Sequence, residues 1–213
     1  MTGTGGEQGT GDDPTLRFYE TRAAEHAARA GGAADGELAG FVAALPRGAR
    51  VLELGCGAGH DALAMLRAGI DLHPTDGAVA MAGLAAARLR AAGQARAVAV
   101  LRFGDLAAEA AFDGIWARAA LLHVPRADLP GVLARVFRAL RPGGVQVASF
   151  KAGVAEGRDA HGRLYSYPTA AELVAFYRAS AGWEIETVTT RAGGSFDGPR
   201  GTDWIWIRAR RPA

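Results

Sequence analysis

Apolar residues along this chain fall into two kinds of segment that alternate. Short, nearly continuous apolar runs predict buried β-strands over residues 51–55, 70–75, 97–103, 112–117 and 145–150. Segments in which apolar residues recur at helical spacing separate most of these runs, as over residues 61–69, 79–90 and 129–140. Parallel strands need a long crossover between them, so the alternation indicates a doubly wound, Rossmann-like α/β fold with a mostly parallel sheet.

The two ends of the chain depart from this alternation. Helical patterns over residues 15–30, capped by Thr15, and over residues 37–45 predict an N-terminal helical extension before the first strand. After a last helical pattern, two apolar runs at residues 183–190 and 202–210 follow one another with only a Gly-rich turn between them. They predict an antiparallel hairpin, which gives a seven-stranded sheet with an antiparallel last strand.

The composition is that of one folded domain preceded by a polar segment. The chain has 213 residues, of which 49% are apolar and 22% charged, close to the averages of folded proteins. Residues 1–14 are mainly Gly, Thr and acidic residues with little to bury, so we expect them to be disordered. Residues 15–213 are expected to form a single domain.

Charge and cysteine content argue against several kinds of partner. The chain has 24 basic and 22 acidic side chains, a net charge of +2, which predicts neither nucleic-acid nor membrane binding. It has no apolar run of membrane-spanning length and no exported leader, so a cytoplasmic monomer or homodimer is expected. Because Cys56 is the only cysteine, no internal disulfide is possible. No metal site is expected either, because metal-ligand spacing is lacking at His26, His60, His73 and His161.

The most informative segment is residues 51–60, where a predicted strand runs into three glycines and then a helix: Gly55, Gly57 and Gly59. In such sheets a ligand binds at the carboxyl end of the strand, and glycines let it approach the backbone. A dinucleotide fingerprint would need a further glycine where His60 stands. Glu53, two residues before the first glycine, would repel a phosphate, so the segment favours a ligand that carries positive charge.

A second acidic position lies at the end of the next predicted strand. Asp76 follows Gly59 by 17 residues, where a carboxylate can accept hydrogen bonds from both hydroxyls of a ribose. A helix N-cap would need the same residue type at the same place, so that alternative stays open. Asp71 is a competing candidate, but it stands too early in the strand.

Together these motifs resemble those of the class I S-adenosylmethionine-dependent methyltransferases, over most of the chain from Leu16 to Arg210. VLELGCGAGHDAL resembles the first motif of that family, and Thr75-Asp76-Gly77 its acidic second motif. Gly104-Asp105-Leu106 resembles the turn that holds adenine, and LRPGG the turn before strand five. Segments such as FYETRAAEHA and RLYSYP are most similar to small bacterial methyltransferases near the tellurite-resistance type.

The resemblance implies S-adenosyl-L-methionine as the cofactor, within a core of about residues 49–151. The cofactor site that it implies consists of Tyr19, which closes over the cofactor, Glu53 and Gly55 at the methionine ammonium group, Asp76 at the ribose, Asp105 and Leu106 at the adenine, Arg118 beside the methionine end, and Cys56, Gly57, Gly59 and Gly77. The position of Cys56 between two glycines requires mainly a small side chain, so we expect no nucleophilic role for this cysteine.

Candidate groups for the methyl acceptor lie after the fourth and fifth strands. His123 is a candidate general base, with a packing or capping histidine as the alternative. Tyr165 and Tyr167, in a polar segment longer than packing requires, are expected to face the substrate or to wall the pocket from water. Lys151 could steer an anion, but a surface ion pair is the expectation. Asp105 also has a structural alternative, as a residue that starts a turn, and the family that the chain resembles often has a small or polar uncharged residue where Arg118 stands.

The predicted activity is methyl transfer from S-adenosylmethionine to a small molecule. A thiolate or a metalloid oxyanion would need no base, whereas an alcohol or amine would, so the role of His123 depends on the acceptor. Two alternatives stay open: a cofactor-binding module without turnover, and an NAD-dependent oxidoreductase.

Overall fold

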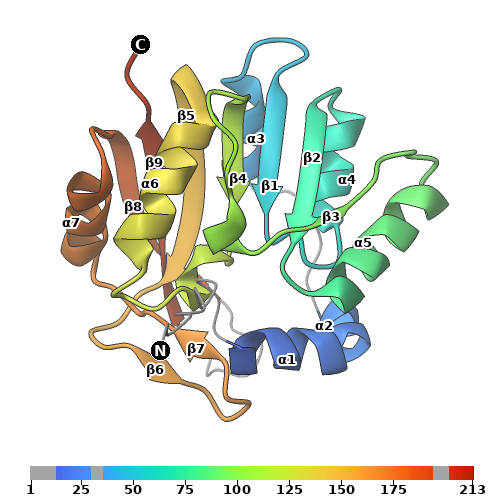
Figure 1. The fold of residues 1–213 in the computed structure, drawn as a ribbon, viewed down its shortest axis with the longest axis horizontal. Helices are drawn as coiled ribbons and strands as arrows, with labels where there is room; N and C mark the ends of the chain where they lie inside the picture. Colours follow the sequence, from blue (N-terminus) through green and yellow to red (C-terminus); the bar gives the residue numbers. More distant parts are fainter. Residues whose placement is uncertain (1–12, 30–35, 194–201) are drawn as a thin grey trace, which may run out of the picture.

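A computed structural model describes residues 13–29, 36–193 and 202–213, and shows a seven-stranded sheet between layers of helices (Figure 1). The strand order is β3-β2-β1-β4-β5-β9-β8. The strands are β1 (Arg50–Leu54), β2 (Asp71–Asp76), β3 (Ala99–Val100), β4 (Phe112–Ala117), β5 (Leu140–Lys151), β8 (Glu184–Gly193) and β9 (Thr202–Arg210). Strands β1 to β5 form the parallel part of the sheet, and β9 is antiparallel to both β5 and β8. The predicted fold class, with its terminal antiparallel hairpin, is confirmed.

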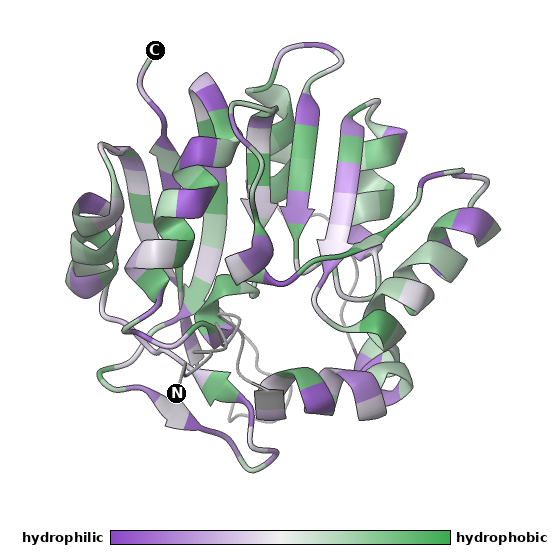
Figure 2. Ribbon diagram, in the orientation of Figure 1, coloured by the Kyte–Doolittle hydropathy of each residue, from purple (hydrophilic) through white to green (hydrophobic). Residues whose placement is uncertain are grey.

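Helices cover both faces of the sheet, and the strands are buried between them. Helix α3 (Gly36–Ala43) directly precedes the first strand. The helices after that strand are α4 (His60–Arg67), α5 (Val79–Ala91), α6 (Leu129–Ala139) and α7 (Ala170–Ser180), and two short 3₁₀ turns are η1 (Phe103–Asp105) and η2 (Leu121–His123). Successive residues of β1 belong to different hydrophobic cores on the two faces of the sheet. Leu52 is in the core with α6 and α7, and Val51 is in the core with α3 and α4. Figure 2 accordingly shows largely hydrophobic strands and helices with hydrophilic outer stripes.

The N-terminal extension differs from its prediction in three ways. The expected single helix is two, α1 (Asp13–Thr21) and α2 (Ala23–Arg29), interrupted at Arg22. Residues 1–12 of the expected disordered segment lie outside the described residues, but Asp13 and Pro14 belong to α1, because the first helical turn tolerates proline. Thr15 is not an N-cap: it is buried, and its hydroxyl accepts a hydrogen bond from the Leu164 N–H at 2.9 Å.

Two further elements differ in extent. The strand expected over residues 97–103 is only β3, because its end winds into the 3₁₀ turn η1. Strand β5 begins at Leu140 rather than after the glycines, with a register shift opposite β4. The polar segment over residues 151–168 contains a small separate sheet, β6 (Gly157–Arg158) and β7 (Leu164–Tyr165). In Figure 1, α1 and the β6–β7 sheet lie side by side at the carboxyl ends of the parallel strands.

Candidate active site

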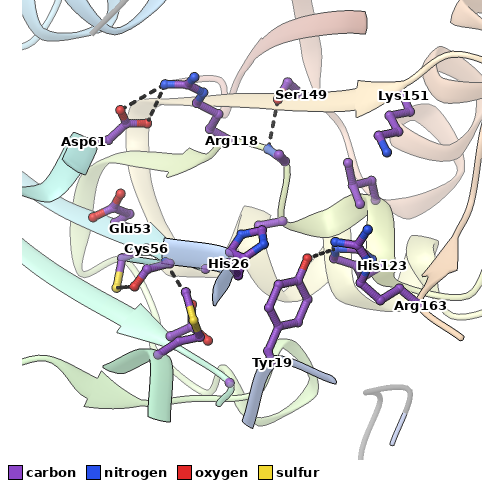
Figure 3. A pocket seen from close by; sticks show the side chains of 18 of the residues that line it. Tyr19, His26, Glu53, Cys56, Asp61, Arg118, His123, Ser149, Lys151 and Arg163 are labelled. Atoms are coloured by element: carbon purple, nitrogen blue, oxygen red, sulfur yellow. Dashed lines mark hydrogen bonds and ion pairs between the residues drawn. The ribbon is translucent and has the colours of Figure 1, made fainter. Parts of the chain in front are cut away.

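A cavity of about 790 Å³ lies at the carboxyl ends of the parallel strands, with α1 on its rim (Figure 3). This volume is within the range of small-molecule sites. Most of the residues predicted for the site line it: Tyr19, Glu53, Gly55, Cys56, Gly57, Asp76, Gly77, Arg118, His123 and Tyr165. The cavity wall does not include Gly59, Asp105, Leu106 or Tyr167.

The glycine-rich loop after β1 brings the backbone to the edge of the cavity. Gly55 has a φ of +72°, and a Cβ atom there would lie 2.6 Å from the Cβ atom of Ala120. Gly57 also has a positive φ, and a Cβ atom there would meet only the Met81 Cε atom, at 3.8 Å. The backbone of Gly57 therefore faces open space in which a ligand can lie. Gly59 instead packs against Ala85 of α5, so its role is in helix packing.

Asp76 anchors this loop from the end of β2. The Gly57 N–H donates to its Oδ2 atom and the Ala78 N–H to its Oδ1 atom, both at 2.9 Å. Burial raises the pKa of the Asp76 carboxyl to about 6, although these backbone hydrogen bonds lower it. Each carboxylate oxygen has a second lone pair, so the group can still accept hydrogen bonds from two neighbouring hydroxyls.

Glu53 is a buried carboxylate on the wall of the cavity, with 2% of its surface exposed. Its Oε2 atom has no hydrogen-bond partner among the described residues. Burial raises the pKa of Glu53 well above its usual range, and the nearby Asp61 and Asp76 raise it further, while Arg118 lowers it. Because an unpaired buried carboxylate is costly, this site favours a cationic ligand group.

Arg118 lies beside Glu53 and is held by Asp61, a residue that the motifs did not indicate (Figure 3). The Arg118 Nη1 atom is 3.1 Å from the Asp61 Oδ1 atom, and the Trp116 indole N–H donates to Asp61 Oδ2 at 3.0 Å. Asp61 stands in the first turn of α4, directly after the glycine-rich loop. An acidic residue at that place was the signal in the sequence that could have indicated Asp61 as part of the site. Glu53 and Arg118 together provide both charges that an amino acid would need.

The two residues predicted to hold the adenine do not line the cavity. Asp105 is exposed and outside the cavity wall, and Leu106 is 3% exposed in the core next to α6. The 3₁₀ turn η1 causes this, because it directs Leu106 inward and brings the ring of Phe103 to the cavity instead. Phe103 offers a flat face for a ring, a role that the acidic motif did not predict.

His123 is engaged by two partners on the other side of the cavity. Its Nδ1 atom is 2.6 Å from the Leu164 carbonyl oxygen, which can only accept, so Nδ1 carries the proton. Its Nε2 atom then accepts a hydrogen bond from the Tyr19 hydroxyl at 2.9 Å. Burial lowers the pKa of His123 to about 4, and the same effect raises that of Tyr19 to about 12. Both groups are therefore neutral at pH 7.

Two cations lie around Tyr165, and neither was predicted to do so. Lys151 was expected at the surface, but it is 7% exposed and its Nζ atom is 4.0 Å from the Tyr165 ring centroid. Residues 144–151 of β5 are all buried, and Lys151 is the last of them. Arg163 is 1% exposed, 2.7 Å from Asp159, and its guanidinium carbon is 5.5 Å from the same ring. Tyr167 stacks on Tyr165 from outside the cavity wall, at 5.3 Å between centroids.

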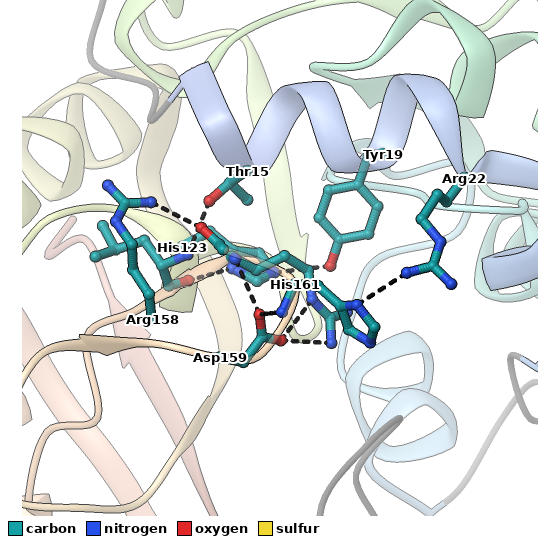
Figure 4. Close-up of polar contacts among 10 residues, drawn as sticks. Thr15, Tyr19, Arg22, His123, Arg158, Asp159 and His161 are labelled. Carbon is teal, nitrogen blue, oxygen red and sulfur yellow. Dashed lines mark hydrogen bonds and ion pairs between the residues drawn. The ribbon is translucent and has the colours of Figure 1, made fainter.

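Hydrogen bonds tie α1 to the β6–β7 segment (Figure 4). Besides the bond between the Thr15 hydroxyl and the β7 backbone, Arg22 Nη1 is 2.8 Å from His161 Nδ1. The His161 N–H in turn donates to the carboxylate of Asp159, at 2.9 Å. The Tyr19–His123 bond lies on the same side of α1. These contacts hold α1 over the cavity as a cover.

Two features are absent from the described residues. They contain no group of three or more His, Cys, Asp or Glu side chains placed to hold a metal ion. Nor does the described part of the chain contain a helix with the length and apolar character needed to cross a membrane.

Comparison with known proteins is consistent with this geometry. Residues 51–144 match the model of the methyltransferase domain family. A 1,6-didemethyltoxoflavin N1-methyltransferase from Burkholderia thailandensis, solved with 1,6-didemethyltoxoflavin and S-adenosylhomocysteine, is 25% identical, with a TM-score of 0.67. The match covers 83% of this chain and 76% of that one. The chain is a class I S-adenosylmethionine-dependent methyltransferase.

Other solved structures share the fold of this methyltransferase at lower identity. A methyltransferase from Methanosarcina mazei is 18% identical over 84% of this chain and 98% of its own, with a TM-score of 0.72. A phosphoethanolamine N-methyltransferase from Haemonchus contortus is 15% identical over 94% of this chain and 60% of its own, with a TM-score of 0.73. A search of curated sequences found no match. The narrower resemblance to the tellurite-resistance type stays a prediction.

The residues of this methyltransferase fit its cofactor. The orphaned Oε2 atom of Glu53 offers an acceptor for the methionine ammonium group, and the open face of Gly57 leaves room for the chain that follows. Asp76 can accept the ribose hydroxyls while it holds the loop. A dinucleotide would instead bring its phosphates next to Glu53, a buried acid.

Proposed function

We propose that this methyltransferase acts on a small-molecule acceptor, which binds in the part of the cavity lined by His123, Tyr165 and Lys151. The observation that carries the proposal is the cover formed by α1, which bonds to η2 and β7 through Tyr19 and Thr15. A methyl acceptor within a protein or nucleic acid would have to displace this cover. A small molecule needs only the volume beneath it.

The proposal assigns the cofactor to the acidic side of the same cavity. Glu53 would hold the methionine ammonium group, and the remaining N–H groups of Arg118 the carboxylate. Asp76 would accept the two ribose hydroxyls, and the ring of Phe103 would lie against the adenine. The side of the cavity that Tyr165 lines would then be left for the acceptor.

The transfer itself demands little of the protein. Bound S-adenosylmethionine supplies a methyl carbon that an acceptor lone pair attacks in line, so that a bond to the acceptor forms, the C–S bond breaks and S-adenosylhomocysteine leaves. The chain contributes orientation, because Glu53 and Asp76 fix one reactant and the covered cavity confines the other. It also contributes a preorganised field where the positive charge of the sulfonium disappears.

His123 is not poised to take a proton from the acceptor. Its Nδ1–H is committed to Leu164, and its only basic atom already accepts from Tyr19. We therefore propose that His123 positions Tyr19 over the cofactor, and that the acceptor attacks without a histidine base. This favours an acceptor that ionises by itself, such as a thiol, an acidic phenol or an oxyanion.

The experiment is a labelling assay with methyl-labelled S-adenosylmethionine and a lysate separated by size. Label is expected in the low-mass fraction, and the Glu53→Gln variant should lose it through weaker cofactor binding. Label in protein or nucleic acid instead would refute a small-molecule acceptor. Retention of S-adenosylhomocysteine with no labelled product in any fraction would favour a binding module without turnover.

A further inference from the structure

The cavity is electrically divided. Four acidic groups among the described residues line it: Glu53, Asp61 and Asp76 lie at the cofactor end, where Asp61 is paired with Arg118, and Glu37 is paired with Arg191. Lys151 and Arg163 line the end beyond His123, and Figure 3 shows them across the cavity from Glu53. A sulfonium cofactor explains the acidic end. It does not explain two buried cations at the other.

Lys151 is the only lysine of the chain, and it lies inside the protein. It ends β5, where its Nζ atom is 4.0 Å from the centroid of the Tyr165 ring and 5.9 Å from that of Trp204. Both rings line the cavity. Burying an ammonium group is costly, and a residue at the rim could snorkel to water. Its inward position places a positive charge beside flat apolar surface.

The carboxylate of Asp159 fixes Arg163 in the same region. Asp159 holds two of its nitrogens, with Nε donating at 2.8 Å and Nη2 at 2.7 Å, but Asp159 does not line the cavity. The guanidinium carbon lies 4.5 Å from the Phe18 ring centroid and 5.5 Å from that of Tyr165. Lys151 Nζ and Arg163 Cζ are therefore no more than 9.5 Å apart, the sum of their distances to the Tyr165 centroid.

The field of both cations reaches the interior of this end. Burial is the largest cause of the lowered pKa of His123, and the hydrogen bond to Leu164 opposes it; the positive charges of Arg163 and Lys151 lower the pKa further, against a smaller opposite effect of Asp159. In surroundings of low dielectric constant, the same field stabilises a bound anion more strongly than it would in water.

We propose that the acceptor is a flat small molecule with an anionic group, and that this group binds between Lys151 and Arg163 while the ring lies along Tyr165 and Trp204. This inference rests on the proposed function. Lys151 and Arg163 then determine which acceptors bind. An anion that is part of the acceptor also agrees with a site in which His123 offers no free base.

The test uses matched pairs of an aromatic carboxylic acid and its primary amide, such as 4-hydroxybenzoate and 4-hydroxybenzamide. They are titrated calorimetrically into protein saturated with S-adenosylhomocysteine, with inorganic phosphate as a third probe. A charged hydrogen bond predicts that acids bind roughly tenfold more tightly than amides. Lys151→Met should remove the difference and Lys151→Arg keep it. Arg178→Met, an equal charge change on an exposed face of α7, should have no effect.

Each outcome separates this inference from the proposed function. Equal binding of acid and amide, a preference that survives Lys151→Met, or no binding of any acid at millimolar concentration would overturn the inference and leave the methyltransferase site intact. Phosphate that binds as tightly as the acids would overturn the flat-molecule part. If S-adenosylhomocysteine itself fails to bind, the proposed function fails with it. Its affinity for Lys151→Met also shows whether that variant is folded.

Discussion

The two ends of the cavity are built in opposite ways. The cofactor end comes from two neighbouring strand ends, where Asp76 bonds to the backbone of Gly57, and its charges are acidic. The acceptor end is assembled from α1, η2, the end of β5 and β7, and its charges are basic. The Tyr19–His123 bond there joins residues 104 positions apart. The comparison teaches that the proposed cofactor end is built from local motifs, whereas the proposed acceptor end depends on distant segments meeting.

The cofactor end contains a glycine with no room for an added methyl group, and this gives the largest expected effect. Gly55→Ala would place a methyl group 2.6 Å from the Ala120 Cβ atom at a positive φ. We expect a loss of about 3 kcal/mol in the free energy of unfolding, from left-handed backbone strain and overpacking together. Urea denaturation measures it. Gly48→Ala is the control, because its φ is similarly positive but no atom lies within 4 Å. Equal losses in both variants would contradict a close approach at Gly55.

The acceptor end contains a histidine whose titration should make the folded state less stable in acid. The pKa of His123 in the folded state is about 4, below its usual value near 6.5, so the unfolded chain binds the extra proton between these values. The contribution of His123 to stability should be complete above pH 6.5 and fall as the pH drops toward 4, by about 3 kcal/mol. Denaturation of wild type and His123→Asn across this range measures the difference. Parallel pH profiles would show that His123 is not the group responsible.

The two acidic residues at the ends of β2, Asp71 and Asp76, give a third comparison. Asp76→Ala should weaken the affinity for S-adenosylhomocysteine by about 1.5 to 3 kcal/mol, the value of a hydrogen bond to a charged group. Calorimetric titration measures it. Asp71→Ala, at the other end of the same strand and 44% exposed, should bind normally. Because burial raises the pKa of Asp76 to about 6, wild-type affinity should also decline as the pH falls below 6. An unchanged dissociation constant for Asp76→Ala would refute the ribose assignment.

The smallest effect concerns the cover over the acceptor end. Tyr19→Phe removes the hydroxyl that bonds to His123 and leaves a buried acceptor atom, so a loss of about 1 kcal/mol is expected. Tyr177→Phe is the matched control: its hydroxyl is buried without a hydrogen-bond partner among the described residues, so its removal should be neutral or stabilising. Thermal unfolding compares the two. No loss in Tyr19→Phe would show that the Tyr19–His123 bond contributes nothing to the stability of the cover.

The cofactor end could largely be read from the sequence, and the acceptor end could not. The segment from Glu53 to Gly59 and the carboxylate of Asp76 stand at strand ends that a parallel sheet must bring to one edge. The adenine side shows the limit of this reasoning, because one 3₁₀ turn replaced Asp105 with Phe103 at the cavity. Whether a polar residue at the end of a strand points outward or inward has no local signature, and Lys151, which ends β5, was accordingly expected at the surface.

The sequence by itself determined the doubly wound sheet, its antiparallel end and the glycine-rich cofactor loop, because periodicity and turn chemistry act between residues that are close in the chain. Tertiary structure alone decided that Arg163 and Lys151 flank Tyr165, that Asp61 holds Arg118, and that Tyr19 closes on His123. Each of these contacts depends on which side chains are excluded from water when separate elements pack. That exclusion turns ordinary polar residues into the charged and covered end of a binding site.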